Sequence, residues 1–367
     1  MTWKLLLVTL PLLAVGLAGC LGDDDADDVD AGPEGAGAQA AYVLDCSIGG
    51  NGWAEPCLAW ASPNESPSKT EIDLVVNPTD PLNVVVASKD LDRAATNDCV
   101  WSVAQVTYDG GHTWNTSYVG GTIADRQPGD PLYGWDCVTD PIMTFNRDGD
   151  LFYNLQAYRL DGEPPNPAGL PGPDAAMMGL FISRDGGTTW PDFVLQQPGD
   201  DLTVFPDYMH MGTNPATGSV FTAWNNIVGL ATSTPTVAAY RGDPLPIATL
   251  HPLVTPDSPT GTGESSIVGA NDGTVYAWLG GFNSPDVAYY SISTDDGLTW
   301  SLPAEAFPFT PMAGLQGVEF RDGTAIELAV DNSGGERDGC LYAAWGGQEA
   351  GVAGGTVDGS DIYVRRS

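Results

Sequence analysis

Thr107-Tyr-Asp-Gly-Gly-His-Thr-Trp114 is a phrase that the chain contains three times. The other copies are Ser183-Arg-Asp-Gly-Gly-Thr-Thr-Trp190 and Ser293-Thr-Asp-Asp-Gly-Leu-Thr-Trp300, and all three read Ser/Thr-x-Asp-x-Gly-x-Thr-Trp. Agreement at this many positions in three places excludes coincidence as its source. A phrase that recurs within one chain indicates a repeat architecture.

Each copy of the phrase follows a strand-like run, so we predict that it forms the turn of a β-hairpin. The aspartates are expected to accept hydrogen bonds from loop N–H groups, the glycines to adopt positive φ, and the tryptophans to anchor the turn against neighbouring strands. The residues with these structural roles are Asp109, Gly111, Trp114, Asp185, Gly187, Trp190, Asp295, Gly297 and Trp300. We therefore predict that the residues of this phrase have a structural role and not a catalytic one.

A second pattern predicts five further hairpins, each made of an apolar run, a turn rich in Asn, Asp, Gly or Pro, and a β-branched or aromatic run. They span Glu71–Ser88, Asp140–Asn154, Asp207–Trp224, Glu264–Trp278 and Thr324–Trp345. Their second strands recur every ~55 to 70 residues, a spacing that suits four-stranded blades of a β-propeller. The stretch from Val228 to Pro246 is expected to hold the remaining strands of the third blade, which lacks the repeated phrase.

The repeated phrase resembles the Asp-box, or bacterial neuraminidase repeat, of the sialidase superfamily. The resemblance implies an all-β fold over residues 42–367, a β-propeller of four-stranded antiparallel blades of the six- or seven-bladed type. In that family the box links the third and fourth strands of a blade, away from the substrate face. About five blades are expected in this chain. Asp361 to Ser367 match a strand that leads into a box, so either the natural protein continues, which we favour, or residues 42–61 return to complete the fifth blade.

The N-terminus has the pattern of an export signal. Residues 1–19 carry one cation, Lys4, and an apolar run from Leu5 to Leu17 that is too short to span a bilayer comfortably. The phrase Leu17-Ala-Gly-Cys20 resembles the lipobox of prokaryotic lipoproteins, which implies lipidation of Cys20; a buried cysteine in a transmembrane helix is the alternative. Residues 20–41 form an acidic, flexible tether. We therefore expect a membrane-anchored lipoprotein at the cell surface or in another extracytoplasmic location.

The cysteines agree with export. Disulfides between Cys46 and Cys57 and between Cys99 and Cys137 are the economical pairing outside the cytosol, although connectivity does not follow from sequence. Cys340 is left without a partner, as a missing C-terminal piece or a buried free thiol would explain.

The charge balance limits the partners. The chain has 48 acidic and 13 basic residues and a net charge of −35, so nucleic acid and anionic lipid headgroups are poor partners for the folded domain. Solubility in a salty medium is the first interpretation of these carboxylates. Ca²⁺ is the one cofactor candidate, because the loop Asp331–Gly339 offers clustered oxygen ligands. With three histidines and no zinc spacing, the sequence argues against a transition-metal site.

Acidic residues begin four of the predicted first strands, at Glu71, Asp140, Asp207 and Glu264. Innermost strands of a propeller line its axis, so these carboxylates are expected to converge at one mouth of the central channel. There they would hold a cation or raise one another's pKa. The competing interpretation is that each acid caps its own turn.

The catalytic signature of sialidases is not recognisable in this sequence. The family holds the substrate carboxylate with three arginines and uses a tyrosine paired with a glutamate and an aspartate acid/base. The arginine-Ile-Pro phrase that usually opens the sialidase domain is absent. Arg93, Arg126 and Arg159, predicted in loops opposite the boxes, are the best cationic candidates, and solvated loop arginines are the competing description.

The same face is predicted to carry long loops with the aromatic residues Tyr118, Tyr133, Trp135 and Tyr158, which suit sugar binding by stacking. A protein partner would use this surface equally well. Two functions remain open. We favour a lipid-anchored, non-hydrolytic propeller that binds extracellular glycan or protein; the alternative is a secreted exo-sialidase-type glycoside hydrolase.

Overall fold

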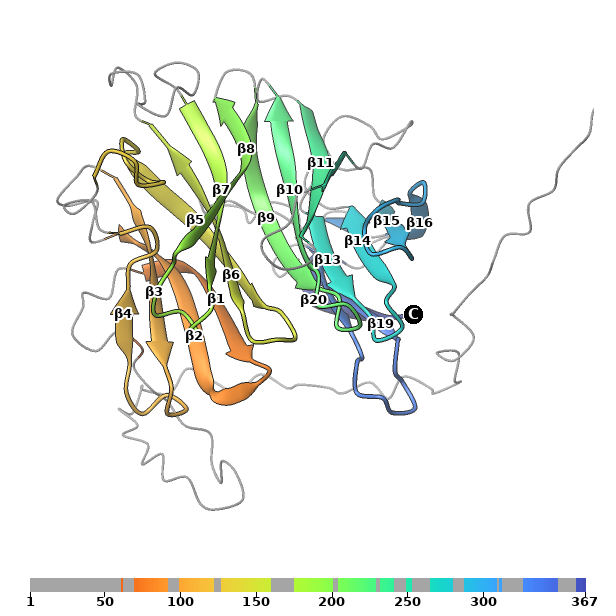
Figure 1. The fold of residues 1–367 in the computed structure, drawn as a ribbon. Coiled ribbons are helices and arrows are strands. Elements are labelled where there is room, and N and C mark those ends of the chain that lie inside the picture. Colours follow the sequence, from red (N-terminus) through yellow and green to blue (C-terminus); the bar gives the residue numbers. More distant parts are fainter. Residues whose placement is uncertain are drawn as a thin grey trace, which may run out of the picture.

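The chain folds into five antiparallel blades arranged as a β-propeller (Figure 1). The computed structural model describes residues 61, 69–91, 99–121, 127–159, 175–200, 204–228, 232–240, 249–252, 265–279, 287–308, 310–311, 326–348 and 361–367. Every element in these ranges is a β-strand. The predicted all-β propeller is confirmed.

Blades 1 to 4 each consist of four strands that pair in chain order. Blade 1 contains β1 (Lys69–Asn77), β2 (Asp80–Asp90), β3 (Trp101–Thr107) and β4 (Asn115–Ser117). Blade 2 contains β5 (Cys137–Phe145), β6 (Leu151–Tyr158), β7 (Ala175–Ser183) and β8 (Asp192–Asp200). Blade 3 contains β9 (Phe205–Thr213), β10 (Val220–Val228), β11 (Thr232–Tyr240) and β12 (Thr249–Pro252). Blade 4 contains β13 (Ser265–Gly269), β14 (Val275–Leu279), β15 (Val287–Ser293) and β16 (Ala304–Pro308).

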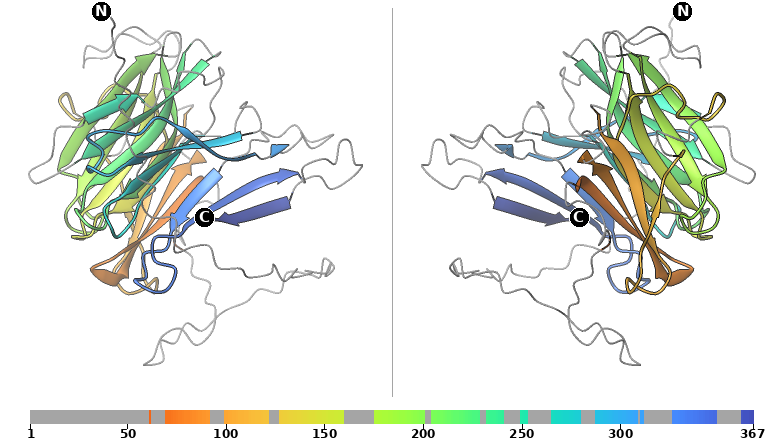
Figure 2. Two further views of the ribbon diagram at one scale, coloured as in Figure 1. Left: turned by 90° about the vertical axis from the view of Figure 1, so that its right-hand side faces the viewer. Right: turned by 90° about the vertical axis from the view of Figure 1, so that its left-hand side faces the viewer.

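Blade 5 has a different composition. Its strands are β18 (Ile326–Val330), β19 (Leu341–Gln348) and β20 (Asp361–Arg366), and the short β17 (Thr310–Pro311) pairs with the end of β19. β20 pairs with β19, so the last residues form the third strand of a blade, as predicted. Figure 2 shows β19 and β20 extending away from the strands of blades 1 to 3.

The five predicted hairpins are confirmed as β1–β2, β5–β6, β9–β10, β13–β14 and β18–β19. The expected range for the rest of blade 3 was too short. β11 falls inside it, but β12 begins at Thr249, after Pro246. The connection between β11 and β12, where a box would stand, lies outside the described residues.

The hydrophobic core lies between the faces of neighbouring blades. Blades 1 and 2 share the largest cluster, in which Trp101, Tyr153 and Phe181 are almost completely buried. Smaller clusters follow between later blades. Each blade therefore stabilises the next one through alternating apolar side chains on β-branched and aromatic strands.

The repeated phrase forms the same turn in blades 1, 2 and 4, between the third and fourth strands. In the first copy, Asp109 accepts hydrogen bonds from the N–H of Thr113 at 2.8 Å and from the hydroxyls of Thr113 and Thr107 at 2.7 and 2.8 Å. The second and third copies repeat these bonds around Asp185 and Asp295. The glycine two residues after each aspartate has φ between 77° and 106°. Because the backbone and hydroxyl donors favour the charged form, the pKa of Asp109 falls to about 2.

The turn also joins neighbouring blades. In blade 2, the carbonyl of Gly186 accepts a hydrogen bond from Asn83 Nδ2 of blade 1 at 3.1 Å. Gly186 has φ 72°, and a Cβ there would lie 2.6 Å from Asn83 Oδ1. The Tyr108 hydroxyl of blade 1 also bonds to Thr188 in the blade 2 turn, at 2.6 Å.

Blades 3 and 4 use a different pair of side chains at the same junction. Asp296 replaces the glycine, at φ 60°, and its carboxylate accepts hydrogen bonds from Ser219, Thr217 and Asn214 at 2.5, 2.8 and 2.9 Å. Ser219 is the counterpart of Asn83. Each lies directly before the residue of the second strand that pairs near the end of the first strand, Val220 in blade 3 and Val84 in blade 1. Asparagine thus faces glycine in the junction between blades 1 and 2, and serine faces aspartate in the junction between blades 3 and 4.

Candidate functional site

A cavity of about 530 Å³ opens where the first strands of all five blades meet. Its lining carries five carboxylates and one histidine, interspersed with apolar side chains; the charged or titratable members are Glu71, Asp73, Asp140, Asp207, Glu327 and His210. The three described members of the expected acidic set therefore line one cavity at the propeller axis. The fourth, Glu264, lies outside the described residues.

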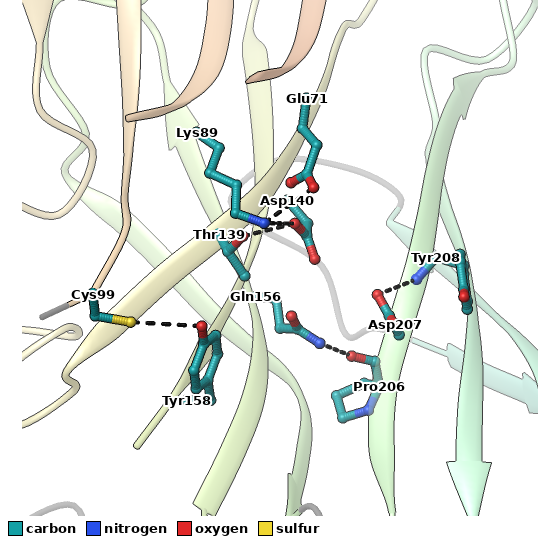
Figure 3. A network of polar contacts seen from close by, with 10 residues as sticks. All are labelled: Glu71, Lys89, Cys99, Thr139, Asp140, Gln156, Tyr158, Pro206, Asp207 and Tyr208. Carbon is teal, nitrogen blue, oxygen red and sulfur yellow. Dashed lines mark hydrogen bonds and ion pairs between the residues drawn. The ribbon is translucent and has the colours of Figure 1, made fainter. Parts of the chain in front are cut away.

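A lysine bridges two of these carboxylates across blades 1 and 2 (Figure 3). Lys89, at the end of β2, places Nζ 3.0 Å from Glu71 Oε1 and 3.3 Å from Asp140 Oδ1. The Thr139 hydroxyl donates to the same oxygen of Asp140 at 2.7 Å. An ammonium group thus occupies the position between two carboxylates where a cation was expected.

The bridge separates the acidities of its two carboxyl groups. Burial, then hydrogen bonding and charge repulsion from Asp140, raise the pKa of Glu71 to about 7. Burial also acts to raise the pKa of Asp140, but hydrogen bonds from Glu71 and Thr139 and the charge of Lys89 outweigh it, and the pKa is lowered. Glu71 is therefore the weaker acid of the pair.

A second polar cluster comes from three first strands. His210 Nε2 lies 2.7 Å from Glu327 Oε2, and the Ile267 N–H donates to Nδ1 of the same ring at 3.4 Å. With Nδ1 accepting, Nε2 is the nitrogen that donates to Glu327. The hydrogen bond to His210 lowers the pKa of Glu327. Asp73 lies on the same lining and accepts hydrogen bonds from the N–H groups of Met143 and Leu74 at 2.6 and 2.9 Å.

The acidic set is not aligned as the sequence suggested. A bulge near the start of β1, β5 and β9 gives a positive φ to Glu71, Asp140 and Tyr208. Tyr208, not Asp207, is thus the counterpart of the two acids. Asp207 lies one residue earlier and accepts a hydrogen bond from the Tyr208 N–H at 2.8 Å, as a turn-capping acid would.

The described residues do not form the expected metal sites. Among them, no three His, Cys, Asp or Glu side chains are grouped to hold a metal ion. In the loop Asp331–Gly339, carboxylate oxygens of Asp331 and Asp338 instead accept hydrogen bonds from Ser333 N–H, Gly334 N–H and Asn271 Nδ2. These bonds close the turn on itself and on blade 4.

The predicted aromatic residues have different surroundings. Trp135 is 1% exposed and belongs to the core between blades 1 and 2, so its expected role in stacking on a ligand is wrong. Tyr118 packs against the same core, and Tyr133 is half-buried. The Tyr158 hydroxyl lies 3.5 Å from Cys99 Sγ, beside the channel mouth.

Of the three candidate arginines, the structure describes Arg159. Its side chain is 4% exposed and Nε lies 3.9 Å from Asp136 Oδ2. The description of Arg159 as a solvated loop residue is therefore wrong, and its guanidinium is not presented to a ligand. Arg93 and Arg126 lie outside the described residues.

The disulfide prediction is confirmed for Cys99 and Cys137, whose Cα atoms are 5.3 Å apart. Cys340 is also disulfide-bonded, so the expectation that it lacks a partner is wrong. Cys20, Cys46 and Cys57 lie outside the described residues. The described part of the chain contains no helix capable of crossing a membrane.

Sequence reasoning missed Lys89, Asp73, His210 and Glu327. The last three share a signal that was available, because each is a polar residue between two apolar ones in a predicted first strand. Such residues alternate to one face of the strand, which in a first strand is the channel. Lys89 had the weaker signal of a lone cation at the end of an apolar strand.

The raised pKa of Glu71 makes stability depend on pH. The folded pKa of about 7 lies above the ordinary 4.5, so the unfolded chain ionises first as pH rises, and Glu71 destabilises the fold progressively from about pH 4.5 to pH 7 and fully above it. Glutamine imitates the protonated form. We expect Glu71→Gln to raise the Tm above that of the unaltered protein at pH 8 and to leave it nearly unchanged at pH 4.5.

Thermal denaturation followed by circular dichroism measures this difference. Glu305→Gln is the matched control, because Glu305 is exposed on β16. An equal Tm gain at both pH values would contradict the assignment of the raised pKa to Glu71.

Comparison with known proteins finds similarity in fold. No protein-family model and no curated protein sequence matches the chain. A protein of unknown function from Dyadobacter fermentans is 14% identical, with 81% of this chain and 78% of that one covered and a TM-score of 0.49. The Hadza microbial sialidase Hz136 is 15% identical, with 77% and 54% covered and a TM-score of 0.49. NanB sialidase from Streptococcus pneumoniae is 10% identical, with 84% and 63% covered and a TM-score of 0.47. The chain thus spans about half the length of Hz136.

Proposed function

We propose that this protein is a non-hydrolytic, sialidase-like propeller that binds an extracellular glycan or protein at its channel mouth. It is held at the cell surface by a lipid on Cys20 and by the tether of residues 20–41. Its ligand presents neutral hydroxyl groups or amines to the mouth. A basic segment of an extracellular protein has the same chemistry.

The charge of the mouth is the observation that supports this proposal. Five carboxylates line the cavity. Each described Lys or Arg at the channel-mouth end of the propeller lies against a carboxylate. The pairs are Lys69 with Asp90, Lys89 with Glu71 and Asp140, and Arg159 with Asp136. A sialic acid carries its own carboxylate, which these groups would repel. Hydroxyl and ammonium groups find acceptors there instead.

A glycoside hydrolase is the second candidate, and the acidities of Glu71 and Asp140 favour it. A carboxylic acid with a pKa of about 7 beside an ionised carboxylate has the properties of a general acid and its partner. Lys89, however, contacts both groups and draws them together. Glycosidases keep their two carboxyl groups about 5 to 9 Å apart to accommodate the sugar or water.

Two assays on the purified protein test these functions together. We expect no release of fluorophore from a sialoside or from neutral glycosides. On a glycan array we expect binding to neutral or amino-bearing glycans and little binding to sialylated ones. Asp140→Asn is expected to weaken that binding about tenfold, because it replaces a charged hydrogen-bond acceptor in the mouth.

The matched control is again Glu305→Gln, which leaves the mouth intact. Hydrolysis that disappears in Glu71→Gln would establish the hydrolase instead. Binding that is equally strong in Asp140→Asn and in the control would exclude the mouth as the binding site. Preference for a lysine-rich peptide over every glycan would identify the ligand as a protein.

A further inference from the structure

Blades 1 and 5 each expose one apolar sheet face. On β1, Ile72, Leu74 and Val76 are 64%, 57% and 48% exposed, and on β20, Ile362 and Val364 are 79% and 68% exposed. These residues alternate with side chains that pack toward the neighbouring blade. Monomeric proteins rarely leave such rows of β-branched and leucine side chains in water.

The opposite faces of the same strands are occupied. Val75 of β1 packs against the core shared with blade 2. On β20, Tyr363 stacks on Trp345 with ring centroids 5.7 Å apart, and Arg365 lies 5.0 Å above the ring of Phe307 in blade 4. The exposed rows therefore belong to the faces that point away from blades 2 and 4.

Cys340 lies at the end of blade 5 that corresponds to the position where blades 1 and 3 contact the turn of the next blade. It directly precedes Leu341, the residue that pairs with the end of β18, and so matches Asn83 and Ser219. Those two residues reach the turn of the next blade by hydrogen bonds. Cys340 is 1% exposed and disulfide-bonded.

The other half of that disulfide comes from the N-terminal part of the chain. Cys99 and Cys137 are bonded to each other, which leaves Cys20, Cys46 and Cys57. Residues 42–60 contain two of these and the large apolar side chains needed to cover a sheet face, namely Tyr42, Val43, Leu44, Ile48, Trp53, Leu58 and Trp60. They contain only two charged residues, Asp45 and Glu55.

We propose that residues 42–60 bind between blades 5 and 1, joined to Cys340 through Cys46 or Cys57. The segment then covers Ile362 and Val364 on one side and the apolar row of β1 on the other. The chain length permits this, because the 12 residues from Cys57 to Lys69 reach up to about 40 Å when extended. The disulfide supplies across this junction what Asn83 and Ser219 supply by hydrogen bonds, and it replaces a pair between Cys46 and Cys57.

Peptide mapping of the alkylated, non-reduced protein tests the linkage. Asp-N protease suits a chain with so few lysines, and mass spectrometry of its products is expected to show a reducible peptide pair joining Cys340 to Cys46 or Cys57. A pair between Cys340 and Cys20 would overturn both this proposal and lipidation of Cys20. Alkylation of Cys340 without reduction, or a reducible dimer through Cys340, would also overturn it.

Hydrogen exchange tests the docking separately from the bond. In the unaltered protein we expect amides of residues 42–60 to exchange at least about tenfold more slowly than in the variant Ile362→Asp/Val364→Asp, which retains the disulfide. Cys99→Ser is the matched control, since it removes a disulfide elsewhere and should leave that protection intact. Equal exchange in the unaltered protein and in the β20 variant would mean that the segment is tied to Cys340 but not docked.

Discussion

Replacing Gly186 with aspartate will destabilise the protein by about 3 kcal/mol, and changing Asn83 to serine in the same chain will restore most of that loss. The single substitution places a Cβ 2.6 Å from Asn83 Oδ1 and imposes φ 72° on a residue with a side chain. Overpacking costs about 1 to 3 kcal/mol, and a positive φ at a non-glycine residue about 1 to 2. The turn would have to move away from blade 1.

The double variant copies the junction between blades 3 and 4. Serine removes the obstructing amide, and Asn77, the counterpart of Asn214, can donate to the new carboxylate once its present acceptor on Asn83 is gone. Urea denaturation of the two single variants and the double variant gives the coupling energy, expected at about 2 kcal/mol in favour of the pair. Additive losses would show that the two junctions are not interchangeable.

Replacing Trp135 with alanine will cost about 3 to 5 kcal/mol of folding free energy, the usual range for a buried aromatic residue. Trp135 is 1% exposed in the core between blades 1 and 2, and no smaller side chain fills its volume. We therefore expect a large fall in the urea midpoint. Any fall in ligand binding should follow the folded fraction.

Tyr133→Ala is the matched control, because Tyr133 lies two residues earlier in the same loop and is half-buried. Its free energy of unfolding should stay within about 1 kcal/mol of that of the unaltered protein. A folded Trp135→Ala protein that selectively loses binding would return Trp135 to the ligand site.

The fold could be predicted because its signals are local. The phrase around Asp109 contains its own hydrogen-bond acceptor, glycine and aromatic anchor, so three copies identify three turns wherever they lie in space. Apolar runs around short polar turns identify hairpins in the same way. Between them these patterns placed the first two strands of every blade and the third strands of blades 1, 2 and 4.

The site was harder to predict because it depends on register and on neighbours from other blades. The bulge that gives Tyr208 a positive φ moves Asp207 out of line with Glu71 and Asp140. The sequence of these strands contains no signal for the bulge. Trp135 appeared to belong to a surface loop, yet Leu132, three residues before it, is also completely buried. The disulfide of Cys340 could not be predicted either, because connectivity does not follow from the spacing of cysteines.

The two ends of the propeller respond differently to dissolved salt. At the turn end, blades 1 and 2 are joined by amide, hydroxyl and carbonyl groups, as in the bond from Asn83 to Gly186. At the mouth, the same blades are joined by the ion pair of Lys89 with Asp140 and by the Cys99–Cys137 disulfide. Since the side chains of Lys89 and Asp140 are partly buried, mobile ions screen their attraction only in part, and the disulfide does not depend on salt. Salt therefore weakens one of the two links at the mouth and leaves the covalent link and the hydrogen-bonded turns in place.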